Sequence, residues 1–260
     1  MIKKEIKEQL DYYVEKYNTS NFIKEDPISL VHRFSRKEDI EIIGLIMATI
    51  SWGNRKSIIK NGFHLLQIMN NKPYEFTMNY KEKEMNHLLK FKHRTFNSFD
   101  LHFFILRIQD LYLNKGGLEK IFTDGFRINN TADQAINYFR ECFITKEFEE
   151  IRTKKHIANP LKGSAAKRIN MYLRWMVRKD TKNVDFGLWK GISASYLSCP
   201  LDVHSGRTAR KFQLITRKQN DIKTVHELDS ALKKLDPLDP VKYDFALFGY
   251  GMENKIDYSI

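Results

Sequence analysis

The sequence predicts an all-α protein, and three observations support this prediction. Breakers of regular structure are sparse, with only 12 Gly and 6 Pro in 260 residues. Apolar residues recur at helical spacing, and few stretches alternate apolar and polar residues as a strand would. Signals that start or end helices repeat along the chain. We therefore expect about ten short helices and no β-sheet.

The first expected helices lie in the N-terminal half. The apolar stretch 39–50 predicts a buried helix, and Gly53 and Asn54 break it before a second helix begins. Pro73 ends that second helix, because proline cannot continue the backbone hydrogen-bond pattern. Residues 100–113 (DLHFFILRIQDLYL) predict a further helix that is apolar over most of its surface.

Start and stop signals place the later helices. Residues 131–134 (TADQ) and 224–227 (TVHE) have the form of capping boxes. Ser164 is a natural N-cap for the apolar helical run that follows it. The Asp-Pro pair at 239–240 is typical of an N-cap followed by proline at the first helical position, and Gly249 is expected to end that helix.

The charge balance points to a polyanionic partner. Lys and Arg number 44 against 32 Asp and Glu, a net charge of +12. This excess favours nucleic acid or an anionic membrane, and a merely solvated lysine-rich surface is the alternative. The longest apolar run, residues 42–52, is too short to span a bilayer, and the N-terminus lacks the apolar run of a signal peptide. We therefore expect a soluble cytoplasmic protein without membrane contacts.

Several kinds of site are not predicted. The two cysteines, Cys142 and Cys199, are too few for a four-thiolate zinc or iron–sulfur site, and nothing motivates a disulfide between them. No glycine-rich phosphate loop, HExxH pair or GxSxG nucleophile motif occurs. The sequence thus predicts neither a cofactor nor a structural metal.

Lys167 stands in an unusual position for a lysine. It follows the Ser164 cap by three residues, in a helix turn whose unpaired N–H groups give it partial positive charge. A solvated lysine, placed there at a small cost in stability, is one interpretation. The other is that the positive helix end favours the neutral amine, which is a nucleophile.

The residues around Lys167 resemble a known hairpin. Leu161-Lys-Gly163-Ser-Ala-Ala-Lys167 is similar to the L-P-G-x-G hairpin and following catalytic lysine of the helix-hairpin-helix (HhH-GPD) DNA glycosylase superfamily, which includes endonuclease III and 8-oxoguanine DNA glycosylase. That family also carries an aspartate in a V-D-x-H or P-x-D-x-H segment. In this chain the segment CPLDVH puts Asp202 and His204 in those places.

Two further stretches extend the resemblance over about residues 40 to 250. The stretch IGLIMATISWGNRKSI (residues 43–58) looks like the family's early helix and turn, whose tip usually inserts a polar residue into the DNA stack. The resemblance implies that Asn54 would contact DNA there. The stretch YDFALFGYG (residues 243–251) looks like a late helix of the family. The chain as a whole also resembles an uncharacterised bacterial family of unknown function, a likeness that implies no chemistry.

The hairpin departs from the family's pattern at two positions. Lys162 replaces the usual proline, and Ala165 replaces the second glycine, which puts in doubt the tight loop that holds a DNA phosphate, often through a monovalent ion. The 35-residue separation of Lys167 and Asp202 is longer than in endonuclease III and closer to the archaeal 8-oxoguanine branch.

The resemblance implies a DNA glycosylase with lyase activity in base-excision repair, acting as a monomer on damaged or abasic double-stranded DNA. Lys167 would be the nucleophile, and Asp202 would stabilise positive charge on the sugar and help to deprotonate the lysine. The residues implied to contact DNA are Lys162, Gly163, Ser164, Ala165, His204, Arg207 and Asn54.

The implied fold has two helical lobes. Residues 36–194 would form one lobe that ends in the helix-hairpin-helix at about 150–178, and residues 1–35 plus 195–260 would form the other. We expect Lys167 and Asp202 to come together.

Other functions remain open on the sequence alone. Asp202 could serve only as the N-cap of the next helix, His204 could be a surface histidine, and Arg207 a solvated charge. A non-catalytic, structure-specific DNA-binding protein on the same scaffold is the main alternative. A helical RNA-binding or scaffold protein with an accidental motif match is the third possibility.

Overall fold

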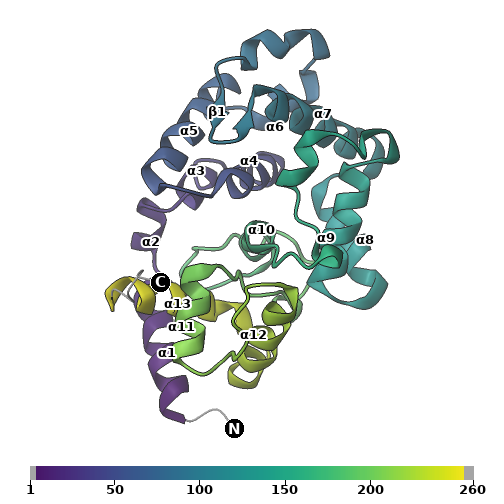
Figure 1. The fold of residues 1–260 in the computed structure, drawn as a ribbon. Coiled ribbons are helices and arrows are strands. Elements are labelled where there is room, and N and C mark those ends of the chain that lie inside the picture. Colours follow the sequence, from purple (N-terminus) through teal and green to yellow (C-terminus); the bar gives the residue numbers. More distant parts are fainter. Residues whose placement is uncertain (1–3, 255–260) are drawn as a thin grey trace. The chain divides into compact units, whose positions relative to one another are not determined.

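The computed structural model describes residues 4–254 and confirms the all-α prediction (Figure 1). Helix makes up 67% of the structure and strand 3%. The described residues divide into two compact units. Unit 1 comprises residues 4–22, 130–133 and 159–254, and unit 2 comprises residues 23–129 and 134–158.

Unit 2 is built around a helix with no polar face. Its principal elements are α3 (Ile28–Val31), α4 (Lys37–Ile50), α5 (Arg55–Ile68), α6 (Pro73–Asn79), β1 (Lys92–His93), β2 (Phe96–Asn97), α7 (Ser98–Lys115), α8 (Leu118–Asn129) and most of α9 (Ala132–Phe143). Eleven consecutive residues of α4, Ile40–Ile50, are buried. The apolar run in the sequence is therefore explained by burial all round the helix.

The expectation of no sheet is wrong in one small place. Strands β1 and β2 form an antiparallel hairpin in which His93 pairs with Phe96. Each strand has only two residues, too few to produce a detectable alternation of apolar and polar side chains. Arg94 makes the turn with a φ of 55°. Arginine rarely adopts this left-handed conformation, so its presence did not predict the turn.

Unit 1 combines the first helix of the chain with the last four. It contains α1 (Lys4–Tyr17), α10 (Lys167–Val177), α11 (Val203–Lys211), α12 (Ile222–Leu235) and α13 (Tyr243–Glu253), while α2 (Ser20–Lys24) joins the two units. Helix α1 lies along α13, and α11 also packs against α13 (Figure 1). These helices enclose an apolar core that includes Leu10, Leu201, Leu228 and Leu247.

Gly249 does not end a helix, as the sequence suggested, but lies inside α13. A Cβ atom at this position would approach the Tyr17 ring to 2.1 Å. The glycine is therefore needed for the close packing of α1 on α13 rather than for a left-handed turn.

Two expected helix starts are displaced. Helix α12 begins before the predicted box at 224–227, because Asp221 caps it by accepting a hydrogen bond from the Thr224 N–H at 3.0 Å. Helix α10 begins at Lys167, not after Ser164, and its N-cap is Ala166 with a φ of 49°. Asn54 does cap α5, through a 3.2 Å bond from the Ser57 N–H.

The boundaries of the units differ from the expected lobes. The hairpin segment and α10 belong to the same unit as residues 195–254, not to the unit that contains α4–α9. Backbone pairing explains this, since Ser164 bridges to Asp221 and the Ile222 N–H donates to the Gly163 carbonyl at 3.1 Å. Lys167 and Asp202 therefore lie within one folded unit.

Candidate active site

A tight turn leads into α10. A short 3₁₀ helix, Pro160–Lys162, is followed by Gly163 with a φ of 91°. A Cβ on Gly163 would meet no atom within 4 Å, so the backbone conformation alone calls for glycine there. Ala165 does not have a positive φ, and the replacement of the family's second glycine is thus compatible with this backbone; the strained alanine is its neighbour Ala166.

Most amides of this turn are used inside it. The N–H of Lys162 donates to the Asn159 side chain at 3.2 Å, and the N–H of Gly163 donates to the Pro160 carbonyl at 2.8 Å. The Ala166 N–H donates to the hydroxyl of Ser164 at 3.2 Å. The first turn of α10 then begins at Lys167, where helix amides have no partner within the helix. An anion at this turn would therefore contact the amide N–H groups at the start of α10 and the exposed Lys162 side chain.

The structure brings Lys167 and Asp202 together. Asp202 is the N-cap of α11, and its Oδ1 accepts hydrogen bonds from the N–H groups of His204 at 2.9 Å and Ser205 at 3.0 Å. Its second oxygen, Oδ2, lies 3.6 Å from the Lys167 Nζ. The two side chains are 32% and 37% exposed, so a ligand in solution can reach both.

The capping role fixes the charge and orientation of Asp202. Burial raises its pKa, but the Lys167 ammonium and the N–H groups of Ser205 and His204 outweigh burial and hold the pKa below its ordinary value. Ser205 completes the cap, because its hydroxyl accepts from the Asp202 N–H at 2.9 Å. Asp202 is therefore an ionised carboxylate that the helix cap orients, with its second oxygen 3.6 Å from the Lys167 amine.

A second carboxylate of unit 1 interacts electrostatically with Lys167. Asp244, at the start of α13, accepts a hydrogen bond from Arg174 Nη1 and is 16% exposed. Arg174 also binds Asp185 through its Nε at 3.2 Å. Burial raises the pKa of Asp244 to about 6, against the opposing effects of Arg174 and Lys167. The two aspartates that act on Lys167 thus differ in how readily they bind a proton.

The segment before Asp202 is held by a buried carboxyl group. Asp229 on α12 accepts a hydrogen bond from the Cys199 N–H at 2.9 Å. Burial raises the pKa of Asp229 to about 7, and it also raises the pKa of the Cys199 thiol. Cys199 is a free thiol, as is Cys142.

The Asp229→Asn variant should gain stability relative to the wild type as the pH rises. Because the folded-state pKa of Asp229 is raised, the unfolded chain releases this proton first, and wild-type stability falls between about pH 4 and about pH 7. Asparagine keeps the acceptor for the Cys199 N–H and has no charge to bury. We expect the melting-temperature difference between variant and wild type to grow over this window.

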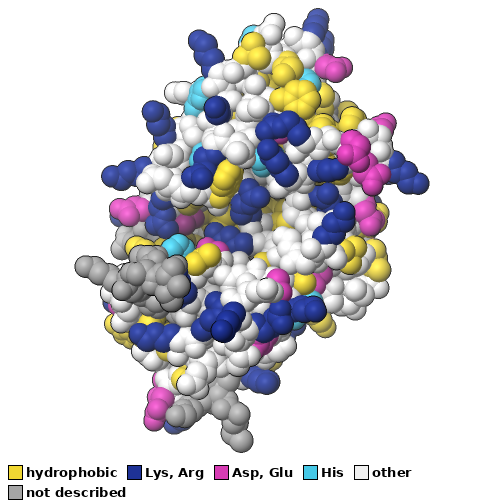
Figure 2. Space-filling model, viewed as in Figure 1, with side chains coloured by type: hydrophobic (Ala, Val, Ile, Leu, Met, Phe, Trp, Pro, Cys, Tyr) yellow, Lys and Arg dark blue, Asp and Glu magenta, His cyan; other side chains and the backbone are white. Residues whose placement is uncertain are grey.

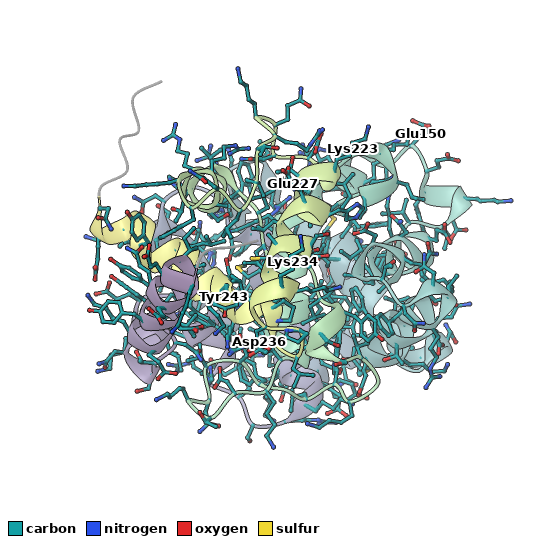
Figure 3. The ribbon with its side chains drawn as sticks, turned by 90° about the horizontal axis from the view of Figure 1, so that it is seen from below. Glu150, Lys223, Glu227, Lys234, Asp236 and Tyr243 are labelled. Carbon is teal, nitrogen blue, oxygen red and sulfur yellow. The ribbon has the colours of Figure 1, made fainter. Side chains whose placement is uncertain are left out.

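The control is Glu150→Gln, which removes a carboxylate whose side chain is 95% exposed (Figure 3). Its melting-temperature difference from the wild type should stay constant with pH. An Asp229→Asn difference that is also constant would contradict the assignment of a raised pKa to Asp229.

The other residues expected at the site differ in how exposed they are and in which unit they belong to. His204 is exposed in the first turn of α11, and Arg207 is half-buried one turn later. Lys162 is exposed on the hairpin, next to the half-buried Ser164. Asn54 belongs to unit 2, where it caps α5. Unit 1 therefore contains every predicted site residue except Asn54, and within it the structure brings Lys167 and Asp202 into contact.

Sequence reasoning missed three charged residues of this region, Arg174, Asp229 and Asp244. Two of them could have been noticed in the sequence, because each is a charged residue within an apolar run: Arg174 in YLRWMV and Asp244 in YDFALFGY. A charge inside an apolar helix is expected to be paired when it is buried. The partner, however, could not be identified without the fold.

Residues 4–254 contain neither a candidate membrane-spanning helix nor a candidate metal cluster. No helix in that range is both long and apolar enough to cross a bilayer. Within the same residues, no group of three or more His, Cys, Asp or Glu side chains is arranged to hold a metal ion.

Comparisons with known proteins identify a family but no activity. No curated protein and no solved structure matches the chain. One family model matches residues 26–253, and its description is "Protein of unknown function (DUF2400)". The match covers most of the chain, including the hairpin and both residues of the Lys167–Asp202 pair. The chain therefore belongs to the DUF2400 family.

Proposed function

We propose that this protein is a DNA glycosylase with lyase activity, which acts on a damaged base in double-stranded DNA during base-excision repair at the nucleoid. One observation carries the proposal: the Lys167 amine lies 3.6 Å from an Asp202 carboxylate whose other oxygen is fixed as a helix cap. The amine follows a hairpin that resembles the one at which such enzymes carry their nucleophile. A binding surface alone needs no such pair.

Lys167 and Asp202 have different roles in base removal. The uncharged Lys167 amine attacks C1′ of a nucleotide turned out of the duplex, and the bond from C1′ to the base breaks. Asp202 stabilises the positive charge that develops on the sugar, because it stays ionised and is oriented before the reaction begins. The sugar ring then opens: the bond from C1′ to O4′ breaks, O4′ takes up the proton that the attached nitrogen has lost, and the product is a Schiff base from which β-elimination can cut the strand.

The positively charged side chains of this protein bind the phosphates of DNA. Lys and Arg side chains are spread over the face seen in Figure 2, in both units. Such contacts go to phosphates and carry no sequence information, which suits an enzyme that must find damage in any sequence. Near the Lys167–Asp202 pair in sequence, Lys162, His204 and Arg207 are the basic side chains that we expect to contact DNA phosphates.

Binding to undamaged duplex DNA should weaken steeply with salt. If about six phosphates are neutralised, the slope of log K against log salt concentration should be about −5, because each contact releases bound counterions. Fluorescence anisotropy titrations at several salt concentrations measure this slope. Affinity that does not respond to salt would argue for a scaffold protein rather than a DNA-binding one.

Borohydride trapping tests the proposed activity. Duplex DNA with one abasic site is incubated with the protein and sodium borohydride, which reduces a Schiff base to a stable amine. We expect a covalent protein–DNA adduct that resists denaturing electrophoresis. An intact abasic duplex that binds but yields no adduct would overturn the enzymatic proposal.

Binding of the abasic duplex without a trapped adduct would support a non-catalytic, structure-specific DNA-binding protein on the same scaffold. One observation favours this candidate, namely that Asp202 already has a structural role as the N-cap of α11. In that case the Lys167–Asp202 pair would only join two helices. Preferential binding to abasic or mismatched duplexes, without an adduct, would be its signature.

A further inference from the structure

Two segments of unit 2 are basic and contain no acidic residue. Residues 52–72, which include α5 and the turn before it, carry four Lys or Arg side chains and no Asp or Glu. Residues 89–99, which include β1 and β2, carry three and likewise no acidic side chain. Strand β1 packs against α5, so the two segments lie together (Figure 1). Their combined charge favours a polyanion.

The turn of the β hairpin lies against the turn before α5. The guanidinium of Arg94 lies over the Trp52 ring, 4.6 Å from its centre. A Cβ atom on Gly53 would lie 2.8 Å from Arg94 Nη1, so the arginine side chain crosses the glycine at van der Waals distance. The glycine therefore makes room for the contact between Arg94 and Trp52.

This contact includes two unfavourable features. Arg94 has a φ of 55°, in the left-handed region. The indole N–H of Trp52 is buried and has no acceptor among the described residues. Strained backbone gathers at functional sites, and a buried polar group without a partner needs an explanation. A function in binding explains why the pair is kept.

His93 joins the hairpin to the helices on which it packs. Its Nε2 lies 3.0 Å from the Trp52 carbonyl oxygen, which can only accept, so Nε2 carries the hydrogen. Nδ1 then accepts from Asn61 Nδ2 on α5 at 2.8 Å. Burial lowers the pKa of His93 and favours the neutral ring that both bonds require. The hairpin and Trp52 are therefore held together before any ligand binds.

Arg94 is free to bind a further group. It is exposed, and within the described part of the chain its guanidinium has no hydrogen bond or ion pair. A planar guanidinium stacks on nucleobases as it does on aromatic rings. Because the left-handed turn and the Trp52 ring already restrict the arginine, stacking costs little conformational freedom.

We propose that Arg94 and Trp52 form a stacking site for an unpaired base of a DNA strand, and that the exposed lysines of α5 and β1 bind the adjacent phosphates. Those lysines are Lys56, Lys60 and Lys92. The faces of a base inside a duplex are covered by its neighbours, so a stacking site selects unpaired nucleotides. The site lies in unit 2 and needs no reaction at Lys167, and it therefore goes beyond the proposed function.

Intrinsic fluorescence tests the site, because Trp52 is the accessible tryptophan. It is half-buried, whereas Trp175 and Trp189 are 0% and 1% exposed. Titration with single-stranded oligodeoxythymidylate should quench the wild-type emission to a plateau. The same titration of Trp52→Phe should show no quenching. Quenching that persists in Trp52→Phe would overturn the inference.

A second ligand separates base stacking from phosphate binding. An oligomer of tetrahydrofuran abasic analogues has the same phosphates but no base, and it has no aldehyde with which Lys167 could react. The wild type should bind it about tenfold more weakly than oligodeoxythymidylate of equal length, because stacking of a base contributes to the second ligand alone. Equal affinities would reduce the site to a phosphate contact and overturn the inference.

The decisive variant is Arg94→Gly. Glycine adopts a φ of 55° without strain, so the turn should persist and the melting temperature should not fall. The affinity for oligodeoxythymidylate should fall about tenfold, since the stacking surface is lost. Wild-type affinity in this variant would overturn the inference. If Arg94→Gly does not fold, Arg94→Asn decides by the same criterion, because asparagine also tolerates this conformation.

The matched control is Arg36→Gly. Arg36 is an exposed arginine of unit 2 that lies 4.1 Å from the centre of the Tyr74 ring, but Glu38 pairs with it at 3.0 Å. It is the N-cap of α4, a position that accepts glycine. This variant loses the same charge and should bind oligodeoxythymidylate like the wild type. An equal loss of affinity in both variants would indicate a general effect of charge and overturn the stacking site.

These outcomes are independent of the proposed reaction. A wild type that does not bind oligodeoxythymidylate overturns the stacking site but leaves borohydride trapping at Lys167 as the test of the glycosylase. A wild type that binds as described but forms no adduct overturns the reaction and leaves the stacking site in place.

Discussion

The Asp202→Asn variant is expected to lose catalysis while keeping its stability. Asparagine retains an oxygen that can accept from the N–H groups of His204 and Ser205, so the cap of α11 persists and stability should change by less than about 1 kcal/mol. The amide has no charge, and the developing cationic sugar loses its stabiliser. Turnover should fall by a factor on the order of a hundred or more.

Binding to abasic-site DNA should persist or tighten in this variant, because one negative charge near the phosphates is removed. Single-turnover excision and thermal unfolding measure the two effects separately. Asp221→Asn is the matched control, since Asp221 caps α12 in the same way and also binds a cation, Arg217, at 2.6 Å. A large fall in melting temperature with unchanged activity per folded Asp202→Asn molecule would leave Asp202 a structural residue.

The Lys167→Ala variant should show the largest effect, a complete loss of the trapped adduct. No other group can form the Schiff base at this position if Lys167 is the nucleophile. DNA binding should weaken only modestly, because at most one phosphate contact is lost and the salt slope should change by about 1. Gel analysis of trapping reactions and anisotropy titrations measure the two effects.

Lys167→Arg separates nucleophilicity from charge. Arginine keeps a cation opposite Asp202 but its guanidinium stays protonated and does not act as an amine nucleophile. We expect this variant to bind DNA like the wild type and to form no adduct. An adduct of wild-type yield with Lys167→Arg would place the nucleophile elsewhere.

The fold class could be predicted from the sequence because it depends on local patterns. The buried run of α4 and the cap of α5 at Asn54 are features of short segments. The start of α10 was misplaced because its position depends on contacts far along the chain. Ser164 pairs with Asp221 through its backbone, and its hydroxyl accepts from the Ala166 N–H before the helix begins.

The Lys167–Asp202 pair could be predicted from local motifs, whereas the charged residues around it could not. Lys167 and Asp202 were identified by a resemblance in two short motifs, and the structure places them 3.6 Å apart. Asp244 and Asp229 have no such motif. Their raised pKa values arise mainly from burial, and burial of a single carboxyl group depends on the packing of the whole unit.

Mapping the attachment site of the trapped adduct tests the central claim most directly. After borohydride reduction and proteolysis, mass spectrometry should locate the sugar remnant on the peptide that contains Lys167. Lys223 is the matched control, an exposed lysine in the first turn of α12 in the same unit (Figure 3). The account predicts modification of Lys167 alone, unchanged in Lys223→Ala. Modification spread over exposed lysines such as Lys223, and undiminished in Lys167→Ala, would contradict it.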